Sequence, residues 1–314
     1  MAAKAIKHRA WFWFAAAIAV VVAALAANTV TVDGRIRSAA PRDGGSLIDT
    51  GLVRANVRVD GSGRALVLIH GFAGAIDWWD AVVPALAADH RVVRLDLIGH
   101  GGTAAPAVGY LIKRQAALVA AVLDKLGIAK ATLIGHSMGG DVATAFAEAY
   151  PDRVDGLVLI GSPPAATERY DILTSLYLTP VIGEALSHLR SDRAVRFGLA
   201  QGFAPGFQVP AGFVADVRRL TYNGFRLADR ASVAFRRARP LNQRLADIRP
   251  VPPLLVIVGS LDPFVPPEGA RQLAQVPGAR LVTLDGVGHS PMVEAPADTI
   301  TAIRNFLSGR PVGD

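Results

Sequence analysis

The chain has 314 residues, no cysteine and a formal net charge of +7. Without cysteine it can form no disulfide framework, thiolate nucleophile or cysteine-ligated zinc site. The positive charge comes mostly from arginines scattered through alanine- and valine-rich sequence, and no helix-turn-helix, RNA-recognition or zinc-finger signature accompanies them, so nucleic acid is not an expected partner. The length fits one α/β domain with an insertion better than two ordinary domains.

Residues 1–27 form a hydrophobic N-terminal segment with a basic head, made of Lys4, Lys7, His8 and Arg9. Residues 10–27 carry no charge, and a helix of that length spans about 27 Å, enough to cross a bilayer core. Because basic residues stay on the cytoplasmic side, we expect a membrane anchor that places the rest of the chain on the non-cytoplasmic side. Ala24-Leu25-Ala26 also fits a signal-peptidase site, so a secreted or periplasmic protein is the alternative.

The globular part is expected to begin after a linker. Residues 28–46 are polar and rich in glycine, arginine and aspartate, as linkers are. The alternating residues that follow predict a hairpin of two strands, Leu47–Val53 and Arg54–Val59. Ala65–Ile69 is then a continuous apolar run, the pattern of a strand buried on both faces of a parallel sheet.

Strands and helices alternate through the rest of the chain, apart from one interruption. Further strands are predicted at Val92–Leu95, Ala131–Gly135, Val154–Ile160, Leu254–Val258 and Arg280–Leu284. Helices are predicted near Asp77–Ala88, Tyr110–Leu126, Asp141–Tyr150, Glu268–Val276 and Ala297–Leu307. Repeated strand–helix units imply an α/β fold with a doubly wound, mostly parallel sheet.

The interruption, residues 163–249, has a helical pattern. Its candidate helices are Tyr170–Leu178, Ile182–Leu199 and Phe213–Arg237. Because the insertion lies between two strands of the sheet, it must lie over one edge, and we interpret it as a helical cap on a core of residues 47–162 and 250–314. Six aromatic residues of the cap are candidates for an apolar substrate lining: Phe197, Phe203, Phe207, Phe213, Tyr222 and Phe225.

One serine lies between a predicted strand and a predicted helix. Residues 131–149 read ATLIGHSMGGDVATAFAEA, and Gly135, Ser137 and Gly139 fit the pattern G-x-S-x-G. In this pattern the serine occupies a strained strand-to-helix turn that exposes its hydroxyl. Glycines are needed on both sides because the two backbones pass too close for side chains. Ser137 is therefore the candidate nucleophile.

Two further candidates follow later strands. Asp262 comes after the strand Leu254–Val258, and His289 comes after the strand Arg280–Leu284. Because ligands bind beyond the carboxyl ends of parallel strands, we expect both residues to lie beside Ser137 at one edge of the sheet. A histidine can take the proton of a serine, and an aspartate can orient that histidine and stabilise its charged form.

The order serine, aspartate, histidine is that of α/β-hydrolases, and residues 47–308 resemble this family, in particular its cap-bearing, serine-dependent esterases and lipases. His70-Gly71-Phe72 resembles the family's HG motif at the end of the third strand. The resemblance implies that the backbone amides of Phe72 and Met138 form the oxyanion hole. It implies no cofactor and no metal, and neither an H-E-x-x-H nor a phosphate-loop pattern is present.

Other residues compete for these roles. Asp96 also ends a strand and lies near His100, but both precede the serine, and their DLIGHG segment resembles a family loop that shapes the site. We expect His70 to be a structural hydrogen-bonding histidine and His136 to point into the sheet packing. Glu294 is interpreted as a capping or structural carboxylate.

A serine nucleophile disfavours the haloalkane dehalogenase and epoxide hydrolase branches, which use aspartate. The resemblance implies a serine hydrolase that cleaves a carboxylic ester or related acyl bond of a hydrophobic small molecule through an acyl-enzyme. The alternatives are a carbon–carbon bond hydrolase, an acyltransferase and a cofactor-free haloperoxidase or perhydrolase. A non-catalytic receptor that uses the cap pocket is a further alternative, but a receptor has no need of the base and the acid.

Overall fold

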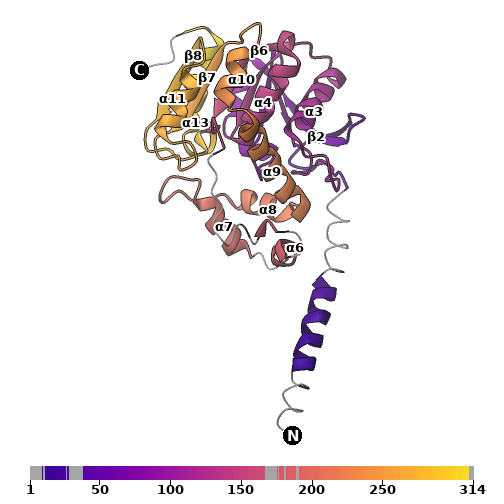
Figure 1. Ribbon diagram of the computed structural model, residues 1–314. Coiled ribbons are helices and arrows are strands. Elements are labelled where there is room, and N and C mark those ends of the chain that lie inside the picture. Colours follow the sequence, from indigo (N-terminus) through magenta and orange to yellow (C-terminus); the bar gives the residue numbers. More distant parts are fainter. Residues whose placement is uncertain are drawn as a thin grey trace.

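A computed structural model describes residues 9, 11–25, 27, 38–166, 175, 177–179, 182–188 and 191–310. An eight-stranded sheet runs through the described part, with the strand order β1-β2-β4-β3-β5-β6-β7-β8 (Figure 1). The predicted hairpin is formed by β1 (Ser46–Asp49) and β2 (Arg54–Asp60). The pairings β1–β2 and β2–β4 are antiparallel, and all other neighbouring strands of this sheet run parallel.

The parallel strands are the apolar runs that the sequence predicts. They are β3 (Arg64–Ile69), β4 (His90–Leu95), β5 (Ala131–His136), β6 (Val154–Ile160), β7 (Leu254–Gly259) and β8 (Ala279–Leu284). The strands β5 and β7 are buried along their whole length, since each has a neighbouring strand on both sides and helices cover both faces of the sheet. The predicted α/β fold with a doubly wound, mostly parallel sheet is therefore confirmed.

Two hydrophobic cores lie on the two faces of the sheet. One is formed with α3 (Ile112–Lys125), α4 (Met138–Ala149) and α11 (Pro267–Ala274), and the short helix η2 (Pro151–Arg153) follows α4. The other is formed with η1 (Ile76–Trp79), α2 (Val83–Leu86), α12 (Pro291–Glu294) and α13 (Pro296–Leu307). The single helix predicted at Asp77–Ala88 is wrong: Pro84 has no N–H to continue a helix and instead lies in the first turn of α2.

Within the described residues, five helices lie between β6 and β7, and we name them the cap helices: α6 (Ile182–Ser187), α7 (Asp192–Ala200), α8 (Ala211–Arg219), α9 (Tyr222–Ala238) and α10 (Leu241–Asp247). Figure 1 shows α6, α7 and α8 below the sheet, while α9 rises beside α4. The helix expected at Phe213–Arg237 is broken, because the Thr221 hydroxyl accepts a hydrogen bond from the Gly224 amide at 2.8 Å and starts α9. Most of the candidate helix Tyr170–Leu178 lies outside the described residues, and the division into core and cap stays a prediction.

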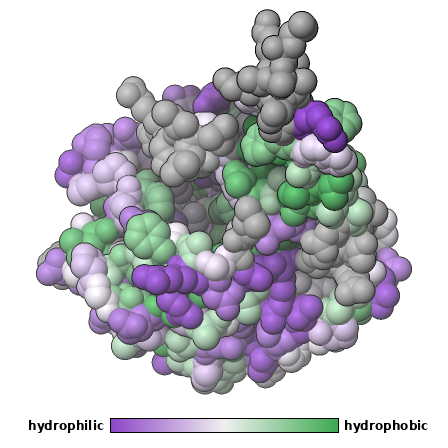
Figure 2. Space-filling view, turned by 90° about the horizontal axis from the view of Figure 1, so that it is seen from below, coloured by the Kyte–Doolittle hydropathy of each residue, from purple (hydrophilic) through white to green (hydrophobic). Residues whose placement is uncertain are grey.

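Residues 11–25 are helical, and several large apolar side chains of this helix are exposed, among them Trp11, Phe12, Trp13 and Phe14. In the view from below, hydrophobic residues gather at the upper right, whereas hydrophilic residues cover much of the lower half (Figure 2). No helix within the described residues combines the length and the apolar character needed to span a membrane. Residues 1–8, 10, 26 and 28–37 are outside the described part, so the anchor at residues 1–27 and the linker at 28–46 stay predictions.

Candidate active site

Ser137 alone forms the turn between β5 and α4. Its backbone has φ 49° and ψ −117°, a left-handed conformation that costs about 1–3 kcal/mol for a residue other than glycine. Its amide donates to the Ile160 carbonyl at 2.8 Å, and its carbonyl accepts from the Ser162 hydroxyl at 3.2 Å. The Ser137 residue is partly exposed. The structure thus has the strained turn that G-x-S-x-G predicts, held by backbone contacts to the end of β6.

The glycines around Ser137 are required by close backbone packing. A Cβ atom on Gly135 would lie 2.4 Å from the Gly139 carbonyl oxygen, and one on Gly139 would lie 2.1 Å from the carbonyl oxygen of Ile69. A Cβ on Gly140 would lie 2.1 Å from the Ser162 hydroxyl. Real Cβ atoms do not approach other atoms this closely, so α4 can pack against β3 and β5 only with glycine at these positions.

Asp262 and His289 form a hydrogen-bonded pair beyond β7 and β8. The distance from His289 Nδ1 to Asp262 Oδ2 is 2.9 Å. The other carboxylate oxygen accepts from the amides of Phe264 at 2.8 Å and Val265 at 3.0 Å, which fixes the plane of the carboxylate. Because Asp262 accepts, we assign the proton of the neutral ring to Nδ1, which leaves Nε2 with the free lone pair of a base.

The end of β6 places this pair beside the Ser137 turn. A Cβ on Gly161 would lie 2.7 Å from the His289 carbonyl oxygen and 3.3 Å from Asp262 Oδ2. His136, the residue before Ser137, donates from Nε2 to the same His289 carbonyl at 2.9 Å, and the two imidazole rings are 4.9 Å apart. Across the described residues, no hydrogen bond joins the Ser137 hydroxyl to the His289 ring. Such a bond often tightens only when substrate binds.

Phe72 and Met138 each have a backbone amide without a hydrogen-bond acceptor among the described residues. Met138 is the first residue of α4, where amides have no partner within the helix. Phe72 follows β3, whose last carbonyls pack directly against Gly139. Ala73 has a left-handed φ of 61°, and the Gly74 amide closes this turn on the Gly71 carbonyl at 3.1 Å. Both predicted oxyanion donors therefore lie where the end of β3 meets the start of α4.

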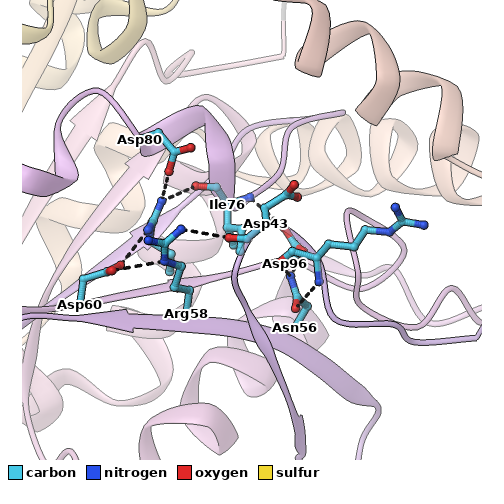
Figure 3. A network of polar contacts seen from close by, with 9 residues as sticks. Asp43, Asn56, Arg58, Asp60, Ile76, Asp80 and Asp96 are labelled. Atoms are coloured by element: carbon cyan, nitrogen blue, oxygen red, sulfur yellow. Dashed lines mark hydrogen bonds and ion pairs between the residues drawn. The ribbon is translucent and has the colours of Figure 1, made fainter.

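Asp96, the competing acid, has a structural role. It is fully buried and accepts hydrogen bonds from the Asn56 side chain at 2.7 Å and the Ile76 amide at 2.9 Å (Figure 3). It also accepts one from the Gly102 amide at 2.8 Å. Burial raises the pKa of Asp96 to about 7, although these hydrogen bonds oppose the shift. Asp96 thus joins β2, η1 and the loop at Gly102, and it makes no contact with His289 among the described contacts.

His70 is a structural histidine, as predicted. The Leu97 amide donates to its Nε2 at 3.0 Å, so its Nδ1 carries the proton and donates to the Gly71 carbonyl at 2.7 Å. Burial lowers the pKa of His70 well below its ordinary value, and burial likewise lowers the pKa of the neighbouring His100 to about 4. Both rings are therefore neutral near pH 7.

Two contacts were missed from the sequence. His136 was expected to serve only the packing of the sheet, but it holds the backbone of His289, and burial lowers its pKa to about 3. Glu294, interpreted as a capping or structural carboxylate, accepts hydrogen bonds from the Gly288 and Ser290 amides on both sides of His289 and from the Ala204 amide of the cap. Two features of the sequence could have indicated these contacts: His136 stands next to the candidate nucleophile, and Glu294 follows His289 closely.

The six candidate aromatic residues of the cap divide by their surroundings. Phe225 packs edge-on against Phe72, one of the two predicted oxyanion residues, with ring centroids 4.7 Å apart. Phe203 and Phe213 are buried, and Phe213 stacks on Trp78 at 4.0 Å. The three others lie elsewhere in the cap: Tyr222 is buried, Phe207 stacks on Phe203, and Phe197 is 71% exposed. Of the six, Phe225 is the one whose ring packs against Phe72 among the described contacts.

One group of side chains in the described part could hold a metal ion. Carboxylate oxygens of Asp43, Asp77 and Asp216 lie within 4.8 Å of one another. Asp216 already pairs with Arg219 at 2.9 Å and accepts a hydrogen bond from the Trp78 indole at 3.2 Å. These partners give the Asp216 carboxylate a structural role of its own.

The sequence and the structure were compared with known proteins. A family model described as alpha/beta hydrolase fold matches residues 64–296. An uncharacterised protein of Mycobacterium tuberculosis is 30% identical over 276 residues, which cover 81% of this chain and 78% of that protein. The 2-hydroxy-6-oxo-2,4-heptadienoate hydrolase of Pseudomonas putida is 26% identical over 287 residues, covering 84% of this chain and 96% of the hydrolase.

The same fold is found in a solved structure. The enol-lactonase from Burkholderia xenovorans LB400 is similar with a TM-score of 0.71 and 25% sequence identity, over 84% of this chain and 100% of the lactonase chain. The family model covers most of the globular part, from the start of β3 to the start of α13. The chain therefore belongs to the alpha/beta hydrolase fold family.

Proposed function

We propose that this protein is a serine hydrolase that cleaves a carboxylic ester or a related acyl bond, with Ser137 as nucleophile, His289 as base and Asp262 as its acid partner. The observation that carries the proposal is the Asp262–His289 pair, 2.9 Å between Nδ1 and Oδ2, next to the strained turn of Ser137. Two unpaired amides, of Phe72 and Met138, support it because acyl transfer needs donors for a developing oxyanion.

In the proposed reaction, His289 Nε2 takes the hydroxyl proton as Ser137 Oγ forms a bond to the carbonyl carbon. The carbonyl oxygen becomes an oxyanion that accepts from the Phe72 and Met138 amides, each worth on the order of 3 kcal/mol in the transition state. The tetrahedral intermediate collapses, His289 gives its proton to the departing alkoxide, and the alcohol leaves. Water, deprotonated by His289 Nε2, then attacks the acyl carbon. As the bond from that carbon to Ser137 Oγ breaks, His289 gives the proton to Oγ, which releases the carboxylic acid and restores Ser137.

The proposed substrate has a hydrophobic group near its acyl carbon. The aromatic rings of Phe72 and Phe225 meet beside the proposed oxyanion amides and offer an apolar surface. The enol-lactonase similarity fits the same chemistry, since a lactone is a cyclic ester. No cofactor takes part in the proposed steps.

A second candidate is hydrolysis of a carbon–carbon bond next to a carbonyl, favoured by the similarity to the Pseudomonas putida hydrolase. The same three side chains would serve, but the leaving group would be a carbanion that needs a proton. An acyltransferase differs only in the second step, in which an alcohol replaces water. In a haloperoxidase or perhydrolase reaction, hydrogen peroxide instead of water would attack the acyl-enzyme in this second step.

We further propose that residues 1–27 attach the enzyme to a membrane, with the catalytic part on the non-cytoplasmic side. The basic head and the uncharged run of residues 10–27 support this proposal. Cleavage after this segment would instead give a secreted or periplasmic enzyme.

The proposed function is tested by measuring hydrolysis of p-nitrophenyl esters of different acyl length by the wild type and by Ser137→Ala. We expect wild-type turnover of some of these esters and a loss of at least about 10³-fold in kcat for Ser137→Ala. Equal activity of the two proteins would contradict the proposal. Adding an alcohol and measuring the new ester separates an acyltransferase from a hydrolase, and a β-diketone or dienoate ketone substrate tests the carbon–carbon reaction.

A further inference from the structure

The turn that follows α7 in the cap touches the backbone of the His289 loop directly. The His289 amide donates to the Gly202 carbonyl at 2.7 Å. A Cβ on Gly288 would lie 2.5 Å from the Ala204 nitrogen, so only a glycine lets the two backbones come this close. Residues 202–204, which we name the cap turn, and the loop 288–290 thus form one backbone-to-backbone contact.

Glu294 joins the two sides of this contact. Its Oε2 accepts from the Ala204 amide at 2.7 Å and from the Gly288 amide at 2.9 Å, and its Oε1 accepts from the Ser290 amide at 3.0 Å. Hydrogen bonds from amides to an ionised carboxylate are roughly twice as strong as those to a neutral acceptor. A glutamine at this position would present its NH₂ group to one of these amides and could not accept all three bonds.

The side chain and the backbone of His289 are therefore held separately. Asp262 orients the ring through Nδ1. Glu294 holds the amides before and after His289, while the Gly202 carbonyl accepts from the His289 amide and His136 donates to the His289 carbonyl. The direction in which Nε2 points depends on both sets of contacts. Of the three backbone partners, Glu294 alone bonds both to the loop and to the cap turn.

We propose that Glu294 is a positioning residue that holds the His289 loop against the cap turn, so that the position of the cap sets the position of the base. This inference rests on the proposed function, because it requires His289 to act as the base for Ser137. Its consequence is that a movement of the cap turn on substrate binding is passed to the His289 backbone through Ala204 and Glu294.

The test compares Glu294→Gln with Glu268→Gln, a control at an exposed carboxylate of α11 that pairs with Arg271 on the surface. Hydrolysis of a p-nitrophenyl ester is measured in the full-length protein and in the His289→Ala background. We expect Glu294→Gln to lower kcat by about 10- to 100-fold with little change in KM, as expected for a misplaced base. In the His289→Ala background we expect no further loss, because Glu294 acts through His289.

A fall in activity of equal size in both backgrounds would show that Glu294 only supports the fold, and unchanged kcat in the wild-type background would also overturn the inference. If Glu294→Gln does not fold, Glu294→Asp is measured in the same way, since it keeps the charge but is one methylene too short to reach all three amides. The proposed function fails separately, if Ser137→Ala keeps full activity. A fully active Glu294→Gln beside an inactive Ser137→Ala contradicts only the role of Glu294.

Discussion

Asp141 of α4 and Arg236 of α9 form a buried ion pair, with 2.9 Å between Asp141 Oδ2 and Arg236 Nη1. The Ser232 hydroxyl donates to the same carboxylate oxygen at 2.5 Å. Because α4 begins directly after Ser137, this pair fastens the longest cap helix to the helix that carries the nucleophile turn.

Replacing Arg236 with alanine would remove the guanidinium that pairs with the buried Asp141 carboxylate. We expect Arg236→Ala to lower the free energy of unfolding by about 3–5 kcal/mol, measured by urea denaturation. Arg271→Ala is the matched control, because its pair with Glu268 is exposed and should be worth about 1 kcal/mol or less. Equal stability losses in the two variants would show that the buried pair is not needed to hold the cap.

Gly139 and Gly198 provide a second matched comparison. Gly139→Ala would place a Cβ 2.1 Å from the Ile69 carbonyl oxygen, so we expect a loss of about 1–3 kcal/mol in stability and a fall in ester hydrolysis as Met138 and Ser137 are displaced. Gly198 lies in α7 with open space around it, and Gly198→Ala should stabilise by up to about 1 kcal/mol. Thermal unfolding and kcat of both variants check this, and an active, stable Gly139→Ala protein would refute the packing argument.

The carboxyl groups of Asp77 and Asp216 make stability depend on pH. Burial, followed by the charge of Asp216, raises the pKa of Asp77 to about 8, while an unfolded aspartate titrates near pH 4. Between these values the folded state binds more protons than the unfolded state, so the free energy of unfolding should fall as the pH rises from about 4 to 8. Above about pH 8 this contribution is constant.

The side chain of Asp77→Asn stays neutral at every pH, so this variant should lose the part of the fall in unfolding free energy with pH that Asp77 causes. Asp96, with its pKa of about 7, also makes the free energy of unfolding fall as the pH rises, and it does so in the wild type and in Asp77→Asn alike. Urea denaturation at pH 5 and pH 8 measures the difference in stability for each protein. The same difference in wild type and Asp77→Asn would mean that Asp77 is already ionised in the folded state at pH 5.

The N-terminal segment is tested in cells. We expect the full-length chain to stay in the membrane fraction after a high-salt wash, because an uncharged helix rather than surface charge would hold it there. A variant without residues 1–27 should leave that fraction. Mass spectrometry of the mature N-terminus checks for cleavage near Ala26, and an uncleaved full-length protein found free of membranes would contradict the anchor.

The sheet and the nucleophile turn could be predicted because their signals are local. Each central strand is a short apolar run, since both of its faces are buried, and each run ends in residues suited to a turn. Gly127, with φ 66°, follows the end of α3, a position that favours glycine. Ser137 needs glycines at fixed distances for steric reasons, so its turn can also be found from a few neighbouring residues.

The helix boundaries and contacts of the cap could not be predicted as well as those of the sheet, because these contacts join residues far apart in the sequence. Ala204 and Glu294 are 90 residues apart, and no local pattern pairs them. The break between α8 and α9 depends on the side chain of Thr221, which lies within an otherwise continuous helical pattern. The hydrogen bond from His136 to the His289 carbonyl spans 153 residues and likewise depends on how the fold brings the end of β5 next to the loop that follows β8.

The most direct measurement is labelling of the full-length protein with a fluorophosphonate, which reacts with a serine only when a base activates it. We expect one labelled peptide, containing Ser137, with the label lost in Ser137→Ala and strongly reduced in His289→Ala. Labelling of Ser137 that is unchanged in His289→Ala, or no labelling of Ser137 in a folded wild-type protein, would contradict a nucleophile activated by His289.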